Sequence, residues 1–204
     1  MPAKRPVPKT AAKAKPSPPS PKSAGEVHVA LLRGINVGGK NPLPMADLVA
    51  VFEAAGCRDV RTYIQSGNVL FRASTATRKG LAQAVTSAIE RRLGLAIPVV
   101  LRSAQELRTA ERTNPYARKA GADEDALHVM FLADAPAKAA VAGLDPRRSP
   151  PDEFTVVGRD VFLRCPNGMA RTKLTNAYFD SKLATVSTVR NWRTLRKLIE
   201  LAGA

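Results

Sequence analysis

The segment from Arg33 to Asn41 (RGINVGGKN) combines residue types that bind anions. It holds two cationic side chains, two amides and several glycines. It lies between a predicted strand and a predicted helix, where backbone N–H groups can point at a ligand. A phosphate or a carboxylate suits this chemistry. The candidate anion-binding residues of the loop are Arg33, Asn36, Gly38, Gly39, Lys40 and Asn41.

Residues 34–40 also fit the spacing GxxxxGK, which cradles phosphates in many nucleotide hydrolases. Asn41 stands where that motif has the serine or threonine that holds magnesium, and Pro42 and Pro44 separate the loop from the helix. The segment therefore departs from a nucleotide-hydrolase loop. A structural interpretation stays open, in which the glycines allow a tight exit from the strand and Asn36 and Asn41 bond the loop backbone.

Two further polar clusters lie in the second half of the chain. One, in the stretch RTKLTN, follows Gly168 at a predicted loop-to-helix boundary, and the other directly precedes Trp192. If both meet the first loop, they form a basic, amide-rich pocket between domains; otherwise they are solvated helix ends with capping residues. The candidate ligand-binding residues are Arg171, Lys173 and Asn176 in one cluster and Arg190 and Asn191 in the other.

Recognisable catalytic and metal-binding groupings are absent from the sequence. There is no GxSxG nucleophile motif, no HExxH and no EF-hand loop. The two cysteines, Cys57 and Cys165, lack a partner at CxxC spacing, and the two histidines, His28 and His128, lie within apolar strands. We therefore predict no cofactor and no metal, and the sequence assigns no reaction.

The charge is strongly positive and uneven. The chain carries +15, of which +6 falls in residues 1–25, so the remaining residues carry +9. Such a balance favours polyanions such as nucleic acid, although a basic surface can also serve solubility alone. Residues 1–25 contain seven prolines and no aromatic residue, which predicts a disordered tail. That tail either clings to nucleic acid by charge or acts as a solubilising extension.

Hydropathy gives no sign of a membrane-spanning or secreted chain. No apolar run reaches the roughly 18 residues that cross a bilayer, and the N-terminus lacks the apolar segment of a secretory signal. We therefore expect a cytoplasmic protein with no membrane partner, and the sequence sets no oligomeric state.

Periodicity predicts alternating strands and helices in the first half of the chain. The first strand is apolar on both faces, which favours burial on both sides. The pair Ser66–Gly67 suits a tight turn, and Ser103 with Glu106 forms a capping box that opens a helix. The predicted elements are a strand at 27–33, a helix at 44–55, a hairpin at 61–65 and 68–72, a helix at 77–93, a strand at 97–102 and a helix from 103 that Asn114–Pro115 ends.

The second half repeats this order. LHVMFL at 127–132 resembles VHVALL at 27–32, and FTVVGRDVFLR at 154–164 resembles TYIQSGNVLFR at 62–72. The other predicted elements are helices at 136–141 and 171–183, a short closing strand at 185–188 and a helix from 191. The βαββαβ order is the split ferredoxin-like arrangement. We therefore predict an α+β protein with two tandem ferredoxin-like (alpha-beta plait) units, an internal duplication, packed into one body. Its domains are expected at 26–115 and at 116–204, the latter with the C-terminal helix.

Three stretches between about residue 27 and residue 200 form a specific set. They are HVALLRGINVGGKNPLPMADL, VRTYIQSGNVLF, and GMARTKLTNAYFDSKL followed by RNW. Together they resemble the bacterial family known as domain of unknown function 1697. The resemblance implies a pair of ferredoxin-like plait domains and brings no activity, catalytic residue or cofactor with it. The basic tail lies outside the family pattern.

Three functions are open at this point. The charge of tail and body favours non-catalytic binding of nucleic acid or another polyanion through phosphate contacts. Aromatic residues make up only 5% of the chain and no RNA-module aromatic motif occurs, so stacking of bases on a sheet is not expected. The second interpretation is a small-molecule or phosphometabolite-binding enzyme with a basic interdomain cleft. The third is a structural or protein-interaction module.

Overall fold

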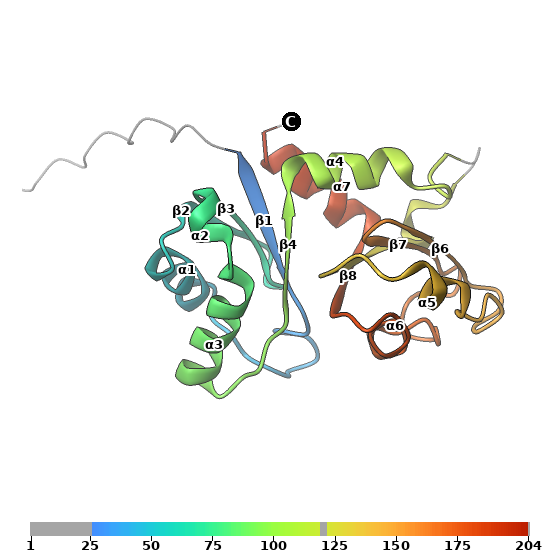
Figure 1. The fold of residues 1–204 in the computed structure, drawn as a ribbon, viewed down its shortest axis with the longest axis horizontal. Helices are drawn as coiled ribbons and strands as arrows, with labels where there is room; N and C mark the ends of the chain where they lie inside the picture. The colour runs from blue at the N-terminus through green and yellow to red at the C-terminus, as the bar shows by residue number, and fades with distance from the viewer. Residues whose placement is uncertain (1–25, 119–121, 204) are drawn as a thin grey trace, which may run out of the picture.

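The computed structural model describes residues 26–118 and 122–203, so the tail predicted at 1–25 lies outside the described residues. Figure 1 shows two groups of strands and helices side by side. In chain order the elements are β1 (Val27–Leu32), α1 (Met45–Ala54), β2 (Arg58–Tyr63), β3 (Asn68–Arg72), α2 (Thr75–Arg78), α3 (Leu81–Leu93), β4 (Val99–Ser103), α4 (Ala104–Thr113), η1 (Glu124–Ala126), β5 (Leu127–Leu132), α5 (Lys138–Ala142), β6 (Glu153–Val157), β7 (Asp160–Arg164), α6 (Asn176–Leu183), β8 (Ser187–Asn191) and α7 (Trp192–Leu201).

The first unit is a four-stranded antiparallel sheet with α1 and α3 packed on one face. Its strand order is β2-β3-β1-β4, and Val29 lies opposite Leu70 on β3 and Arg102 on β4. Apolar side chains at helical spacing, such as Phe52 on α1 and Ile89 on α3, are fully buried. Each such burial contributes about 1.5–3 kcal/mol, which fixes the face that each helix turns to the sheet.

The second unit repeats the pairing as β6-β7-β5-β8, again antiparallel. Met130, Leu163 and Phe179 belong to its separate core, which α6 covers. In each unit the first strand lies between the third and the last. The fold is therefore α+β with two four-stranded antiparallel sheets, each with its own helices, consistent with two ferredoxin-like units.

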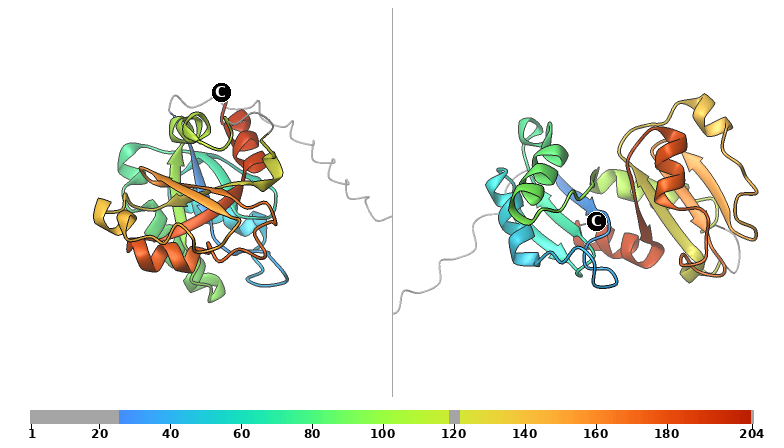
Figure 2. Two further views of the ribbon diagram at one scale, coloured as in Figure 1. Left: turned by 90° about the vertical axis from the view of Figure 1, so that its right-hand side faces the viewer. Right: turned by 90° about the horizontal axis from the view of Figure 1, so that it is seen from below.

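A third core joins the two sheets with helices α4 and α7, which lie between the units in Figure 2. It contains Leu31 and Phe131 from the first strands of the two units, Leu107 of α4, and Trp192 and Leu195 of α7. The two helices pack against each other. Each first strand therefore has two buried faces, one toward its own helices and one toward this shared core.

In both units the last strand runs directly into a helix. Ser103 ends β4 and caps α4: its Oγ accepts the N–H of Glu106 at 3.1 Å, and Glu106 Oε2 accepts the N–H of Ser103 at 2.8 Å. The predicted capping box is thus confirmed. Asn191 ends β8 and caps α7, its Oδ1 accepting the N–H of Thr194 at 2.8 Å. These caps carry the chain from each sheet edge into the shared core.

Two helices differ from the sequence prediction. The helix predicted at 77–93 is split into α2 and α3 at Gly80, which takes a φ of 78°. The helix predicted at 171–183 begins only at Asn176, because Thr175 caps it. Arg171 and Lys173 therefore lie in a loop before the helix and not on its surface.

The closing strand of the second unit also differs from the prediction. It spans Ser187–Asn191 and not 185–188, so Arg190 lies in the sheet where the sequence suggested a polar loop. Among the described residues, no helix has the length and apolar character needed to cross a bilayer.

Candidate functional site

The loop after β1 folds as a small hairpin of its own. Gly38 and Gly39 take positive φ values of 57° and 73° at its tip, and the N–H of Lys40 donates to Val37 O at 3.0 Å. Lys40 lies exposed at this tip, and α1 begins only at Met45. The loop therefore does not deliver its lysine to the N-terminus of a helix, as a phosphate-cradling loop of a nucleotide hydrolase does.

The amides of this loop hold its own backbone. Asn36 Nδ2 donates to Leu43 O at 2.9 Å and to Gln65 O at 3.0 Å, and its Oδ1 accepts the N–H of Leu43 at 2.8 Å. Asn41 Nδ2 donates to Gly34 O at 2.9 Å. Both asparagines thus shape the loop, and Asn36 also fixes it to the turn between β2 and β3.

Arg33 links the first unit to the second. Its Nη1 donates to Asp180 Oδ2 at 2.5 Å and to Ser187 O at 3.0 Å. Ser187 Oγ donates to Asp180 Oδ1 at 2.5 Å and accepts from Asn176 Nδ2 at 2.9 Å. The positive charge of Arg33 is therefore compensated within a network that spans β1, α6 and β8.

Arg190 is buried, with 8% of its surface exposed. Its guanidinium reaches the first unit, where Nη2 donates to Leu32 O at 2.7 Å and to Gly67 O at 3.1 Å, and Nε donates to Asn68 Oδ1 at 2.6 Å. Burial lowers the pKa of Arg190 to about 10. Its Nε and Nη2 are thus used in bonds between the units, and its Nη1 donates to Thr188 Oγ1 and Val189 O on its own strand.

Four of the candidate residues line one groove of about 460 Å³ between the units. They are Arg33, Asn176, Arg190 and Asn191. Val37 and Ile64 also line it and are unusually exposed for aliphatic side chains, at 60% and 51%. Arg190 uses all three guanidinium nitrogens in bonds within the protein. Arg33 donates through Nη1 alone among the described residues, and Asn191 caps α7 through its oxygen, so the groove keeps some donors for a ligand. The candidates that do not line it are Asn36, Gly38, Gly39, Lys40, Asn41, Arg171 and Lys173.

Arg171 and Lys173 instead meet a second basic loop. Ser149 joins the two segments, because its Oγ accepts the N–H of Lys173 at 2.9 Å. Arg147 and Arg148 directly precede this serine, and all four cations are exposed. We call Arg147, Arg148, Arg171 and Lys173 the basic loop patch. Arg147 and Arg148 were not predicted from the sequence as site residues. Their position as adjacent arginines in a proline-rich loop was the signal that could have identified them.

The basic loop patch is sparsely compensated. Within residues 26–118 and 122–203, the ion pairs of the structure include none of its four cations. Two acids lie nearby: Asp145 Oδ1 accepts the N–H of Arg147 at 2.9 Å, and Asp152 Oδ2 accepts from Ser149 at 2.7 Å. The guanidinium carbon of Arg148 lies 4.7 Å from the centre of the Tyr178 ring. The patch thus keeps an excess of exposed positive charge.

The cysteines and histidines do not form a reactive centre. Burial raises the pKa of the thiols of Cys57 and Cys165 to about 11, which keeps both protonated near neutral pH. Burial lowers the pKa of His28 and of His128. In the part of the chain that the structure describes, no three His, Cys, Asp or Glu side chains are grouped to hold a metal ion.

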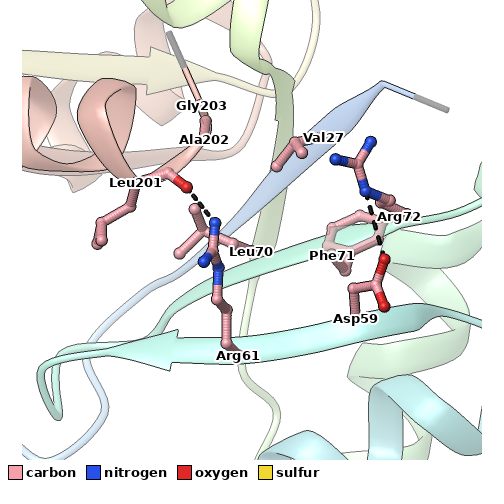
Figure 3. A pocket seen from close by; sticks show the side chains of 9 residues that line it. All are labelled: Val27, Asp59, Arg61, Leu70, Phe71, Arg72, Leu201, Ala202 and Gly203. Carbon is pink, nitrogen blue, oxygen red and sulfur yellow. Dashed lines mark hydrogen bonds and ion pairs between the residues drawn. The ribbon is translucent and has the colours of Figure 1, made fainter. Parts of the chain in front are cut away.

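A pocket of about 280 Å³ lies between strands β2 and β3 and the C-terminal end of α7 (Figure 3). Arg61 Nη2 donates to Leu201 O in the last turn of this helix, and Arg72 Nε lies 3.3 Å from Asp59 Oδ2. A cation at a helix C-terminus satisfies carbonyls that have no partner within the helix. The hydrogen bond from Arg61 therefore holds the C-terminal end of α7 against the first sheet. None of its lining residues was predicted from the sequence as a site residue.

Comparisons with known proteins bear on the family and the fold. The model of the family described as Protein of unknown function (DUF1697) matches residues 26–162, a range that includes Arg147 and Arg148 and ends before Arg171 and Lys173. The solved structure of the conserved bacterial protein SP0830 from Streptococcus pneumoniae is similar over 89% of this chain and 100% of that chain, with a TM-score of 0.64 and 20% sequence identity. At that identity the likeness shows the fold alone. Among curated proteins there is no significant match.

Proposed function

The chain belongs to the DUF1697 family, and from its own geometry we propose that it is a non-catalytic polyanion-binding protein, with nucleic acid as the favoured ligand. The basic loop patch supports this function, because it holds four exposed cations on two loops. None of these cations has an ion-pair partner in the described residues. The charge of +15 for the whole chain has the same sign and adds long-range attraction.

The way the patch is built favours phosphate contacts. The bond from the N–H of Lys173 to Ser149 Oγ holds the two loops together, and none of their four cations forms an ion pair with the nearby acids Asp145 and Asp152. Each phosphate that such a cation neutralises releases counterions into solution. The resulting affinity depends on salt and is insensitive to base sequence.

The positions of the aromatic side chains also favour binding through phosphate contacts. Phe71, Phe131 and Phe162, on the central strands, are buried in the cores, so these rings are not available for bases to stack on. Tyr178 is partly exposed, and the guanidinium of Arg148 lies over its ring. Recognition therefore rests on the backbone of the ligand.

The test is fluorescence anisotropy of a labelled single-stranded oligonucleotide, titrated with the full-length protein over a series of salt concentrations. The patch variant replaces Arg147, Arg148, Arg171 and Lys173 by glutamine. In a plot of log affinity against log salt concentration, each phosphate contact to a single strand contributes a slope of roughly −0.7. If all four side chains contact phosphates, the patch therefore contributes a slope of about −3. The patch variant should lose most of that slope and bind at least about tenfold more weakly at low salt.

A matched control removes the same charge elsewhere. Arg58, Lys79, Arg91 and Arg112 are exposed on the first unit and have no ion pair among the described residues. Their replacement by glutamine lowers the net charge equally and should change affinity far less. Equal losses in the two variants would assign binding to net charge and reject the patch. Absence of binding at low salt would reject the function.

The groove between the units supports a second candidate function, the binding of a small carboxylated or phosphorylated ligand. Val37 and Ile64 expose apolar surface beside polar side chains there, a mixture typical of small-molecule sites. Thermal-shift measurements with nucleotides, sugar phosphates and small carboxylates test this. Val37→Asp should abolish the shift of any ligand that binds in the groove. A ligand whose shift survives both that change and Ile64→Asp binds elsewhere.

We also propose that residues 26–115 and 116–204 are two ferredoxin-like domains that unfold together. The shared core around Trp192 supports this, as do the bonds that Arg33 and Arg190 make between the units. Urea unfolding followed by Trp192 fluorescence and by labelling of Cys57 should give one common midpoint. Two separate midpoints would make the units independent.

A further inference from the structure

A third cavity, of about 200 Å³, lies where the first unit meets the turn between β6 and β7. Its polar lining comes from β1, α2, β4, α4 and that turn, so five segments from both units line it. The polar side chains are His28, Arg78, Arg102, Ser103, Glu106 and Arg159. Neither the groove nor the basic loop patch includes any of them.

One buried hydrogen-bond donor of this cavity, Arg78 Nε, lacks an acceptor among the described residues, and the ring of His28 beside it makes no hydrogen bond there. His28 is 4% exposed and makes no hydrogen bond among the described residues; the Oε2 of Glu26 lies 3.9 Å from its Nε2. Arg78 Nε is buried without a partner, although Nη2 donates to Thr75 Oγ1 at 3.2 Å. A buried donor without an acceptor costs about 1–3 kcal/mol. Such a donor, beside an imidazole that makes no hydrogen bond, indicates that an acceptor belongs in this cavity.

The other charged groups of the cavity are already occupied. Glu106 accepts hydrogen bonds from the N–H of Ser103 at 2.8 Å and from Arg159. Arg102 donates to Leu132 O at 2.8 Å and to Asp160 Oδ1 at 3.2 Å. Arg78 has no ion pair among the described residues. The cavity therefore carries one uncompensated positive charge.

His128, at the equivalent place in the second unit, is different. Its Nδ1 lies 3.3 Å from Ala126 O, so its ring has a partner within the protein. The missing acceptor is therefore a property of the His28 cavity and not a general consequence of a histidine in the first strand of a unit.

We propose that this cavity binds a small oxyanion, a single phosphate or carboxylate group, between His28 and Arg78. The oxygens would accept from the imidazole N–H and from Arg78 Nε, and they would neutralise the free guanidinium charge. A charge-assisted hydrogen bond of this kind is about twice as strong as a neutral one. A volume of about 200 Å³ admits such a group. The site is independent of polyanion binding by the basic loop patch.

His28 supplies a direct probe of this site. Burial lowers its pKa first and Arg78 lowers it further, while Glu26 and Glu106 oppose the shift. Arg102 and Arg159 are the other charged groups of the lining. A bound anion favours the imidazolium, so it raises the pKa of His28. The chain contains just two histidines, so their ring-proton NMR signals can be followed in the intact protein.

The experiment titrates the full-length protein with inorganic phosphate, with acetate and with chloride at constant ionic strength. His128→Gln assigns the two signals. We expect a saturable shift of the His28 signal with phosphate or acetate and none with chloride, and a rise of its pKa by roughly half a unit or more. The His128 signal should stay unchanged. Whichever of phosphate and acetate binds more tightly identifies the group that the site takes.

Arg78→Met is the decisive variant. It removes the unpartnered donor and keeps the aliphatic stem, so the anion-free protein should be as stable as the wild type. Phosphate binding should weaken about tenfold or more, and the rise in Tm that phosphate gives the wild type should disappear. Arg91→Met, on the exposed face of α3, is the matched control and should bind like the wild type. A His28 signal that does not respond to either anion, or equal losses in the two variants, overturns the proposal.

Discussion

The two units place equivalent arginines in opposite halves of one interface. Arg102 on β4 and Arg190 on β8 each lie opposite the third residue of the first strand of their unit. Each then reaches into the other unit, Arg102 to Leu132 O at the end of β5 and Arg190 to Leu32 O at the end of β1. The contact is therefore reciprocal, although the sequences around the two arginines differ.

The two sites differ in how they compensate the charge. Arg102 has the carboxylate of Asp160 at 3.2 Å, whereas Arg190 has the neutral amide oxygen of Asn68 at 2.6 Å. Burial lowers the pKa of both arginines, and at Arg102 Asp160 opposes the shift. Neutral acceptors are thus sufficient to hold a buried guanidinium when they satisfy its donors. The site of Arg102 therefore depends more on its arginine than the site of Arg190 does, because Asp160 would otherwise keep its charge without this partner.

The largest effect is expected at the site with the carboxylate. Arg102→Met leaves Asp160 as a largely buried charge without its guanidinium, so the free energy of unfolding should fall by about 3–5 kcal/mol. Adding Asp160→Asn removes that charge and should recover part of the loss. Urea unfolding of the single and double variants measures both changes. A double variant that is no more stable than Arg102→Met would contradict this reasoning.

Arg190→Met should cost less, about 1–3 kcal/mol, because it leaves only neutral acceptors. Two of these acceptors still have another donor in the variant. Gly67 O accepts the N–H of Leu32 at 2.8 Å, and Leu32 O accepts the hydroxyl of Thr188 at 3.3 Å. Asn68 Oδ1 loses its bond from Nε. The same urea titration gives the value. If Arg190→Met proves as damaging as Arg102→Met, compensation by the carboxylate is not what distinguishes the two sites.

The smallest effect concerns the equivalent histidines and acidic pH. Both have a pKa lowered by burial, so below about pH 6.5 the unfolded chain binds more protons than the native protein. The free energy of unfolding should therefore fall as pH drops through 6.5 toward the native pKa values. Above pH 7 the two histidines should not change the free energy of unfolding. At His128 the Ala126 carbonyl opposes the lowering of the pKa. At His28, Glu26 and Glu106 oppose the lowering of the pKa and Arg78 adds to it.

His28→Gln and His128→Gln separate the two contributions. Each variant should lose less stability than the wild type between pH 7.5 and pH 5.5, by about 1 kcal/mol or less, as measured by urea unfolding at both values. An unchanged pH dependence in both variants would mean that other groups cause the acid sensitivity.

Local patterns predicted most elements of the fold. The apolar spacing of α1 and the Ser103–Glu106 capping box depend on residues within a few positions of one another, and both features are present in the structure. Residues 171–175 were predicted as part of a helix and lie in a loop. There the cap at Thr175 decides where the helix starts.

The candidate site was only partly predictable. Arg190 resembled a loop cation because a charged residue is uncommon in a buried strand, and Asn68, its partner, lies 122 residues away in the chain. Arg147 and Arg148 were overlooked because only the fold brings their loop to Lys173, through Ser149.

By itself, the sequence determined the repeated order of strands and helices, the doubly apolar first strands and the excess of positive charge. These follow from composition and from spacing along the chain, which need no tertiary contact to be expressed. Only the tertiary structure decided which cations are free. Arg33 is neutralised by Asp180 and Arg190 is bonded across the interface, while Arg171 and Lys173 stay exposed. Whether a charge has a partner depends on distance in space, and distance along the chain does not give it.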